Sequence, residues 1–315
     1  MVPAMFTKDA CVQAVEKSER WLGSLIVDPV ALQTKQGMKG KKHFVELLFG
    51  YQFLHMAYQS LGDSQGMDRV AVNFKKAIAS THEDAYHDMG KISDAQFAQD
   101  STSYLAAYQL IQWFGLNNPR YISEIKNILP RIYAYAKTRG ASRRMAFVVR
   151  LQAIGLPSID TLQGLLDASL IRKRKEYVKL DNTDVYLLVH EVFRLTKNGE
   201  QPFFLLTTQD VEYLELIFHF LLKELMASQN VDLLAEVAVA MLFIGRGGSE
   251  EWWAAVNYIL QRQNTNGAFG DYESVREKVR LEGNPYDVDI GIYLHTTIGS
   301  LRVLALSIPF LKGST

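Results

Sequence analysis

The chain has 315 residues, of which 48% are hydrophobic, and its 34 basic and 34 acidic side chains leave no formal net charge. This balance argues against broad electrostatic binding of nucleic acid, and the single cysteine excludes an intrachain disulfide framework or a cysteine-based zinc cluster. Residues 1–21 lack the apolar core of a signal peptide and no run of about 18 apolar residues occurs, so we expect a cytoplasmic protein without a transmembrane segment.

The predicted elements are helices from one end of the chain to the other. Apolar residues recur at spacings of three and four, whereas alternating runs typical of strands are scarce. In chain order the pattern predicts helices within residues 9–22, 44–61, 68–80, 104–114, 119–137, 184–199, 213–226, 232–244, 251–263 and 287–307. The chain is therefore predicted to be all-α, with Cys11 an ordinary, partly buried thiol in the first helix.

Four of these segments, and the stretch that precedes Gly155, end in the same way, with a residue or two, mostly apolar, followed by a glycine. Glycine directly after a helix is the usual left-handed helix stop. The stops are Gly62, Gly115, Gly155, Gly199 and Gly245. Their spacings of 40 to 53 residues fit stacked helical hairpins, and a sixth unit begins near Pro285. We predict one domain, residues 1–315, in which six hairpins close into an α/α toroid with the glycine-stopped helices inside; an open solenoid is the alternative.

Two stretches resemble a known superfamily. QRQNTNGAFGDYE, residues 261–273, is similar to the turn that follows outer helices in the terpenoid cyclases and protein prenyltransferases, and Phe269 between its glycines is predicted to pack. IYLHTTIGSLRVLAL is similar to the last inner helix of prenyltransferase β subunits, where a histidine followed by threonine binds zinc. The likeness is strongest over residues 230–310, and it implies an α/α toroid that holds a small isoprenoid-like molecule.

The sequence also departs from the motifs of this superfamily. Class II cyclases use an Asp-x-Asp-Asp acid, but here Asp287 and Asp289 are followed by isoleucine, and no cysteine completes a prenyltransferase zinc site. Asp184 and Asp289 are read first as helix caps. With Asp287 they are also candidate catalytic acids, because they would lie at the mouth of the cavity.

The cavity itself has further candidate residues. Arg276, Lys278 and Arg280 precede the last inner helix and could hold an anionic or diphosphate substrate, although exposed surface charge is the simpler interpretation. Tyr186 and Tyr293 could line a cavity for a carbocation, or they could pack in the core. His82 and His87 lie in a loop rich in acids, and they are expected to be solvated rather than part of the site.

Aligning the repeats on their closing glycines brings three polar residues to one level. His190 lies nine residues before Gly199, Glu236 lies nine residues before Gly245, and the sixth unit places His295 at the same height. Side chains at one level of adjacent inner helices can converge, and two histidines with one carboxylate are a recurring set of ligands for zinc or non-haem iron. The alternatives are a polar cavity without a metal ion, or three separate packing residues.

The sequence therefore predicts an enzyme with a toroid cavity, dependent on a divalent metal such as zinc or iron. It would act on a hydrophobic or anionic, isoprenoid-like small molecule in a biosynthetic pathway, as a cyclase, lyase or transferase. The alternative is a non-catalytic toroid that binds a ligand or a partner protein. Glycoside hydrolysis ranks last, because Glu236 has no obvious carboxylate partner in the sequence.

Overall fold

A computed structural model describes residues 6–25, 27–30, 40–201, 205–270, 277 and 289–313. Within these residues the chain forms helices and no β-strand; a single isolated bridge joins Gln263 to Phe269. The prediction of an all-α protein is confirmed. The longer helices are α1 (Lys8–Ser24), α3 (Gly40–Leu61), α4 (Ser64–Ala77), α5 (Asp94–Trp113), α6 (Pro119–Lys137), α7 (Ala141–Ala153), α10 (Asn182–Leu195), α11 (Thr208–Ala227), α12 (Val231–Phe243), α13 (Glu250–Gln261) and α16 (Leu294–Ser307).

Short helical pieces connect these elements. They are α8 (Leu162–Leu166), α9 (Leu170–Lys173), the 3₁₀ turns Ile78–His82, Asp84–Tyr86, Tyr177–Lys179 and Ile308–Gly313, and the π-helical turn Asp289–Tyr293. Most of the longer helices begin at a side chain that accepts a hydrogen bond from the free amides of the first turn. Thr207 caps α11 in this way, Asn230 caps α12 and Ser249 caps α13, which fixes where each helix starts.

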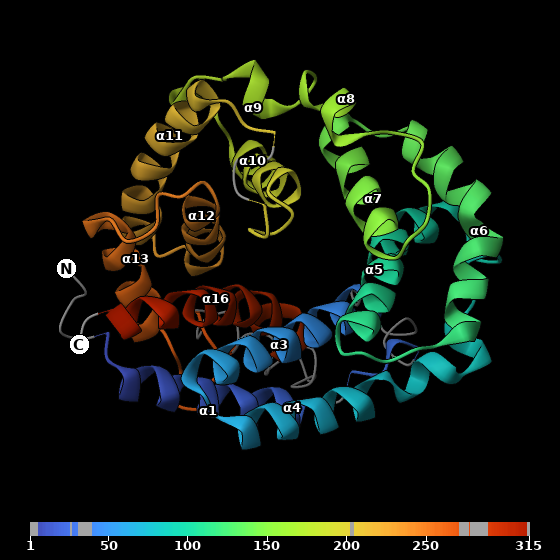
Figure 1. The fold of residues 1–315 in the computed structure, drawn as a ribbon, viewed down its shortest axis with the longest axis horizontal. Helices are drawn as coiled ribbons and strands as arrows, with labels where there is room; N and C mark the ends of the chain where they lie inside the picture. The colour runs from blue at the N-terminus through green and yellow to red at the C-terminus, as the bar shows by residue number, and fades with distance from the viewer. Residues whose placement is uncertain are drawn as a thin grey trace.

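Six helices pack around the middle of the molecule (Figure 1). In cyclic order α3 contacts α5, α5 contacts α7, α7 contacts α10, α10 contacts α12, α12 contacts α16, and α16 contacts α3 again. The last inner helix therefore packs against the first. These six are the glycine-stopped helices and the final helix of the sequence pattern.

The remaining long helices lie on the outside of this arrangement (Figure 1). They are α1, α4, α6, α11 and α13, and each packs on one or more inner helices. Between α7 and α10 only the short helices α8 and α9 occupy the outer position. The outer layer is therefore least regular there.

The closing glycines adopt the backbone conformation that the sequence pattern requires. All five have positive φ, from +69° at Gly115 to +88° at Gly199. A left-handed residue at this point ends the helix and turns the chain toward the next one. Gly199 also lacks room for a side chain, because a Cβ atom would lie 2.4 Å from the ring of Phe243. The glycines were thus a correct signal for helix ends.

The N-terminal helix α1 is joined to the loop after α13. Ser18 Oγ donates a hydrogen bond to the carbonyl of Gly267 (2.9 Å), and Gln263 Nε2 donates to the carbonyl of Ala14 (2.8 Å). Phe269 is fully buried, and its amide donates to Thr297 Oγ1 (2.9 Å). The predicted packing of this loop is confirmed as far as residue 270; residues 271–273 lie outside the described part of the chain.

One segment, Asp289–Leu311, is long and apolar enough to cross a membrane by length and composition alone. However, 61% of its most apolar window is buried within the protein, where α16 packs on α3, α12 and α13. A core helix has the same composition as a membrane span, so the segment is weak evidence for a membrane. The expectation of a cytoplasmic protein remains a prediction.

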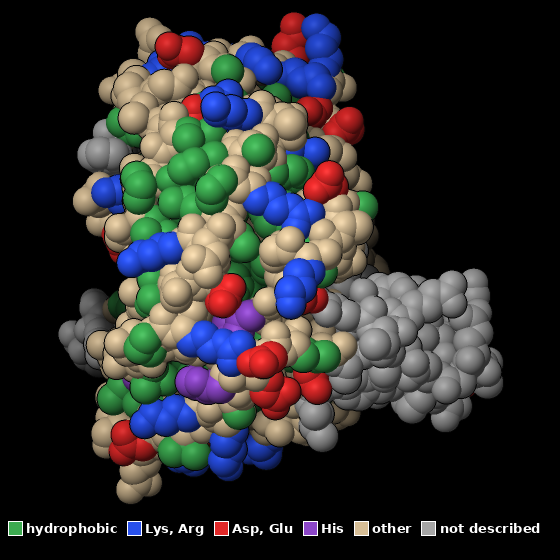
Figure 2. All heavy atoms as spheres, turned by 90° about the vertical axis from the view of Figure 1, so that its right-hand side faces the viewer, with side chains coloured by type: hydrophobic (Ala, Val, Ile, Leu, Met, Phe, Trp, Pro, Cys, Tyr) green, Lys and Arg blue, Asp and Glu red, His purple; other side chains and the backbone are tan. Residues whose placement is uncertain are grey.

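The outer surface over α6 and its neighbours carries charges of both signs (Figure 2). Lysine and arginine side chains alternate with acidic and apolar ones on this face, and pairs such as Arg131 with Asp94 form ion pairs (2.7 Å). Interspersed charges of this kind solvate a surface without creating a strong field of one sign. The more unusual charged groups lie on the inner helices.

Candidate functional site

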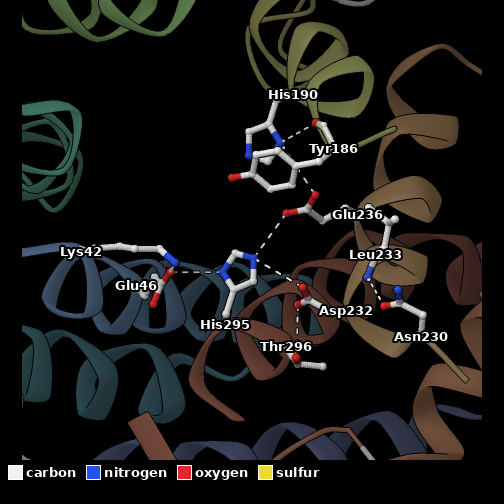
Figure 3. Close-up of polar contacts among 10 residues, drawn as sticks. All are labelled: Lys42, Glu46, Tyr186, His190, Asn230, Asp232, Leu233, Glu236, His295 and Thr296. Carbon is white, nitrogen blue, oxygen red and sulfur yellow. Dashed lines mark hydrogen bonds and ion pairs between the residues drawn. The ribbon is translucent and has the colours of Figure 1, made fainter. Parts of the chain in front are cut away.

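A polar cluster forms where four inner helices face one another (Figure 3). His190 comes from the middle of α10, Glu236 from α12, His295 from the start of α16 and Glu46 from the first half of α3. We refer to these four residues with Asp232 as the central cluster. The first three are the residues that the repeat alignment placed at one level, and Glu46 and Asp232 were not predicted.

Glu236 lies between the two histidines. Its Oε2 is 3.7 Å from His190 Nδ1, and its Oε1 is 3.6 Å from His295 Nε2. The Glu236 side chain is only 11% exposed, and Oε2 is buried without a hydrogen-bond partner. A buried, unsatisfied carboxylate oxygen is costly, so it marks a point where a bound molecule can gain by donating a hydrogen bond.

His295 is surrounded by carboxylates. Its Nδ1 lies 3.1 Å from Glu46 Oε1, and its Nε2 is 3.8 Å from Asp232 Oδ2 as well as 3.6 Å from Glu236. Thr296, the next residue, donates from Oγ1 to the other oxygen of Asp232 (3.1 Å). The His295 side chain remains 38% exposed, so solvent or a ligand can reach the imidazole.

His190 is held by its own helix. Its Nδ1 lies 3.1 Å from the carbonyl oxygen of Tyr186, one turn earlier, and must be the donor because a carbonyl only accepts. This contact places the proton of a neutral His190 on Nδ1 and the lone pair on Nε2. The Tyr186 ring lies against the imidazole, with 4.0 Å between ring centroids, and Tyr186 is 41% exposed.

The environment shifts the pKa values of the two histidines in opposite directions. Burial, with the positive charges of Arg194 and His295, holds the pKa of His190 well below its ordinary value of 6.5. Burial also acts against a charge on His295, but hydrogen bonds with Glu236 and Glu46 dominate and raise its pKa well above 6.5. The cluster thus pairs a neutral imidazole with an imidazolium at neutral pH.

The carboxylates respond in the same electrostatic field. Burial would raise the pKa of Glu46, but the hydrogen bond with His295 and the charge of Lys42 bring it below its usual value. Burial raises the pKa of Glu236, only partly offset by His295, and raises that of Tyr186 to about 12. Of Glu46 and Glu236, Glu236 is therefore the carboxyl group that takes up a proton more readily.

The donor atoms do not match a divalent metal site in this arrangement. Metal-bound imidazoles are neutral and offer a free nitrogen, but the raised pKa of His295 keeps both of its nitrogens protonated. His190 Nδ1, the nitrogen nearest Glu236, donates to Tyr186. Among the described residues, no group of three or more His, Cys, Asp or Glu has metal-binding geometry. The predicted zinc or iron ion remains a prediction.

The predicted rim residues are only partly described. Asp184 lies in the first turn of α10, where it forms a reciprocal capping box with Asp181 and an ion pair with Lys175. The N-cap is Asp181, and Asp184 completes the capping box from the third helical position, about 1.7 turns before His190. Tyr293 is fully buried in the π-helical turn before α16, where its ring packs in the core.

Asp289 is half-buried and opens that turn. Asp287, Arg276, Lys278 and Arg280 lie outside the described residues. Glu191, the neighbour of His190, points away from the cluster. Its two carboxylate oxygens accept the amides of Leu170 and Ile171 (3.1 Å each) at the start of α9.

His82 and His87 do not join the central cluster. His82 is exposed in a 3₁₀ turn. His87 Nε2 donates to the carbonyl of Thr81 (2.9 Å), so its Nδ1 must accept the hydroxyl proton of Tyr104 (2.6 Å). His87 is therefore a packing residue with both nitrogens satisfied, and not the solvated side chain that the loop composition suggested.

The sequence reasoning missed three arginines on the inner helices, Arg150 of α7, Arg194 of α10 and Arg302 of α16. Each is partly accessible, and burial lowers the pKa of each to about 10. A signal for two of them was present, because Arg150 precedes Gly155 and Arg194 precedes Gly199 by the same five residues. The alignment that found His190 therefore also marks these arginines.

Comparison with known proteins identifies a family model that matches the chain, but no individual relative. Neither the comparison with curated proteins nor that with solved structures produced a match. A family model described as a domain of unknown function, DUF6895, matches residues 33–297, which include the inner helices α3, α5, α7, α10 and α12, the first residues of α16 and every member of the central cluster. The chain belongs to the DUF6895 family.

Proposed function

We propose that the six inner helices form an α/α toroid around a ligand site, and that the protein is an enzyme that transfers protons there. The cyclic contacts of the inner helices and their left-handed glycine ends support the toroid. The convergence of His190, Glu236 and His295 supports the site. The proposed substrate is a hydrophobic, isoprenoid-like small molecule, and the reaction is a cyclisation, an elimination or an isomerisation.

One observation carries the proposal of catalysis: two histidines with opposite pKa shifts flank the same buried carboxylate. Groups whose environments separate their pKa values can divide the roles of base and acid at a single pH. His190, neutral with a lone pair on Nε2, is the candidate base. His295, protonated and reachable by solvent, is the candidate acid.

The proton transfers follow from these states. His190 Nε2 takes a proton from a substrate C–H or O–H group, and the hydrogen bond from Nδ1–H to Tyr186 keeps the ring oriented as it becomes charged. His295 gives a proton to the developing anion or leaving group. Glu236, between the two rings, stabilises the positive charge on either of them, and the other carboxylates hold His295 in place.

A panel of substrates with matched variants tests this function. Purified wild-type protein, His295→Gln and His82→Gln would be incubated with isoprenoid alcohols, isoprenyl diphosphates and a metabolite extract, and consumption followed by mass spectrometry. We expect turnover by the wild type and by His82→Gln, because His82 is exposed and outside the cluster, and loss of turnover in His295→Gln. Ligand binding without turnover would instead favour the non-catalytic toroid.

The predicted divalent ion is a separate question, and no step above depends on it. Elemental analysis of the purified protein, with the same turnover assay before and after chelation, tests it directly. Zinc or iron at one ion per chain, lost in both His190→Gln and Glu236→Gln, would support the predicted metal site. Binding of the ion would then require His295 to release its proton.

A further inference from the structure

Three arginines project from inner helices near the central cluster without a carboxylate partner among the described residues. Arg194 is one helical turn after His190, and Arg302 is two turns after His295, so they lie about 6 and 10 Å further along their helices. Arg150 occupies the equivalent repeat position on α7. By contrast, arginines of the outer helices, such as Arg69 of α4 and Arg131 of α6, form ion pairs with acidic residues.

Neutral groups hold each guanidinium in place. Arg194 donates to the carbonyl (2.6 Å) and the hydroxyl (3.0 Å) of Ser142, and Arg302 donates to Asn198 Oδ1 (3.1 Å). Arg150 hydrogen-bonds the side-chain oxygen of Gln109. None of these contacts neutralises a charge, so the positive potential remains available to a ligand.

Aromatic rings fix two of the arginines relative to each other. The Arg302 guanidinium lies over Phe193 (4.3 Å), Phe243 (5.0 Å) and Phe53 (5.4 Å). Arg150 lies over Phe49 (5.3 Å), and Phe49 stacks on Phe53 with 6.0 Å between ring centroids. The two guanidinium groups are therefore linked through aromatic rings from three inner helices, α3, α10 and α12.

We propose that Arg150, Arg194 and Arg302 bind the oxyanion group of a ligand, either a phosphate ester or a polycarboxylate. Arginine suits this role because its planar fork can offer two parallel N–H donors to an oxyanion. Counting the central cluster, four cationic side chains, including His295, share the interior with three carboxylates. An anionic ligand would neutralise the positive charge of the three arginines, because the three carboxylates already surround His295.

The inference extends the proposed function, because an anchored anion would place the rest of the ligand one to two helical turns away, beside His190 and Glu236. It does not require turnover. Burial lowers the pKa of all three arginines to about 10, and a neighbouring arginine adds to the effect on each, Arg194 for Arg150, Arg150 for Arg302 and Arg143 for Arg194; a bound anion would relieve this unfavourable burial of positive charge.

Calorimetric titration of the full chain with inorganic diphosphate and, separately, with citrate tests the site. We expect saturable binding of at least one anion at one site per chain, weakened roughly 10- to 100-fold in Arg302→Gln and in Arg194→Gln, as for the loss of one charge-assisted contact. Preference for diphosphate assigns a phosphate ester, and preference for citrate assigns a polycarboxylate. The matched control is Arg246→Gln. Arg246 lies just after α12, is half-exposed and is already paired with Glu215, so this variant should bind like the wild type.

The wild type alone can overturn the inference, since no saturable binding of either anion would do so even if the variants failed to fold. Equal affinity in folded Arg302→Gln, Arg194→Gln and Arg246→Gln would show that the arginines serve packing only. Anion binding without turnover of any substrate would leave this site standing and remove the proposed catalysis, so the two failures are distinguishable.

Discussion

Two histidine clusters on adjacent parts of the same fold differ in how completely their polar atoms are satisfied. Around His87, Tyr121 donates its hydroxyl proton to the carbonyl of Tyr104 (2.7 Å) and accepts one from Tyr86 (2.7 Å), and both His87 nitrogens are engaged. In the central cluster, Glu236 Oε2 is buried without a partner, and His295 is charged and partly exposed. A satisfied polar network stabilises a fold, whereas an unsatisfied one is what ligand binding and catalysis require.

The contrast between the two clusters is tested most directly by substituting one histidine in each of them. We expect His190→Gln to reduce turnover by about 10²- to 10⁴-fold, the usual contribution of a general base, with a change in unfolding free energy below about 1 kcal/mol, since one hydrogen bond is lost. His87→Gln should instead lower stability and leave turnover of the folded protein unchanged. Urea denaturation and the assay above measure both, and the opposite pattern would reverse the two assignments.

The next largest effect concerns the contact of helix α1 and helix α16 with the loop after α13. Phe269 is fully buried and its loop is tied to α1 and α16. Phe269→Ala should therefore cost about 3 to 5 kcal/mol of stability, measured by chemical denaturation. Phe310→Ala is a useful control, because that ring is 38% exposed. An unchanged free energy of unfolding for Phe269→Ala would show that the loop adds nothing to the stability of the fold.

A smaller effect tests whether the His87 cluster is a structural network. Tyr121→Phe removes one hydroxyl that both donates and accepts inside the core. It leaves the carbonyl of Tyr104 and the hydroxyl of Tyr86 short of a partner, so we expect a loss of about 1 to 3 kcal/mol in unfolding free energy. Tyr186→Phe, beside the central cluster, should cost less, because that residue is 41% exposed. Equal losses would remove the contrast between the clusters.

The smallest expected effect is a dependence of stability on pH. His295 has a raised pKa in the folded protein, so its stabilising contribution is complete at and below pH 6.5, the ordinary value, and is lost as the pH rises through the folded pKa. The difference in unfolding free energy between wild type and His295→Gln should therefore shrink as the pH rises from about 6.5 through the raised pKa of His295. A constant difference would show that His295 is not an imidazolium in the folded state.

His190 is expected to change the pH dependence of stability in the opposite direction. Its folded pKa is depressed, so the unfolded chain takes up a proton first as the pH falls below 6.5, and acid then destabilises the fold. His190→Gln should reduce this acid sensitivity. Resolved NMR titrations of the two imidazoles in the wild type would measure both pKa values without a variant.

Much of the fold was determined by the sequence itself. The three-and-four spacing of apolar residues specified helices, and the glycines that need positive φ specified where five of them end. Because the repeats share a register, the level of His190, Glu236 and His295 could be found without coordinates. The same register contained Arg150 and Arg194, which were overlooked because arginine near a helix end usually reads as an exposed charge.

Tertiary structure decided what surrounds these residues. Glu46 and Asp232 meet His295 only because α3 and α12 both pack on α16, and the resulting carboxylates keep its imidazole protonated. His87, expected in a solvated loop, is fixed by Tyr104 from another element. Local pattern determines which face of a helix a side chain occupies, but its protonation and partners depend on groups distant in sequence, because electrostatic and hydrogen-bond energies act through space and not along the chain.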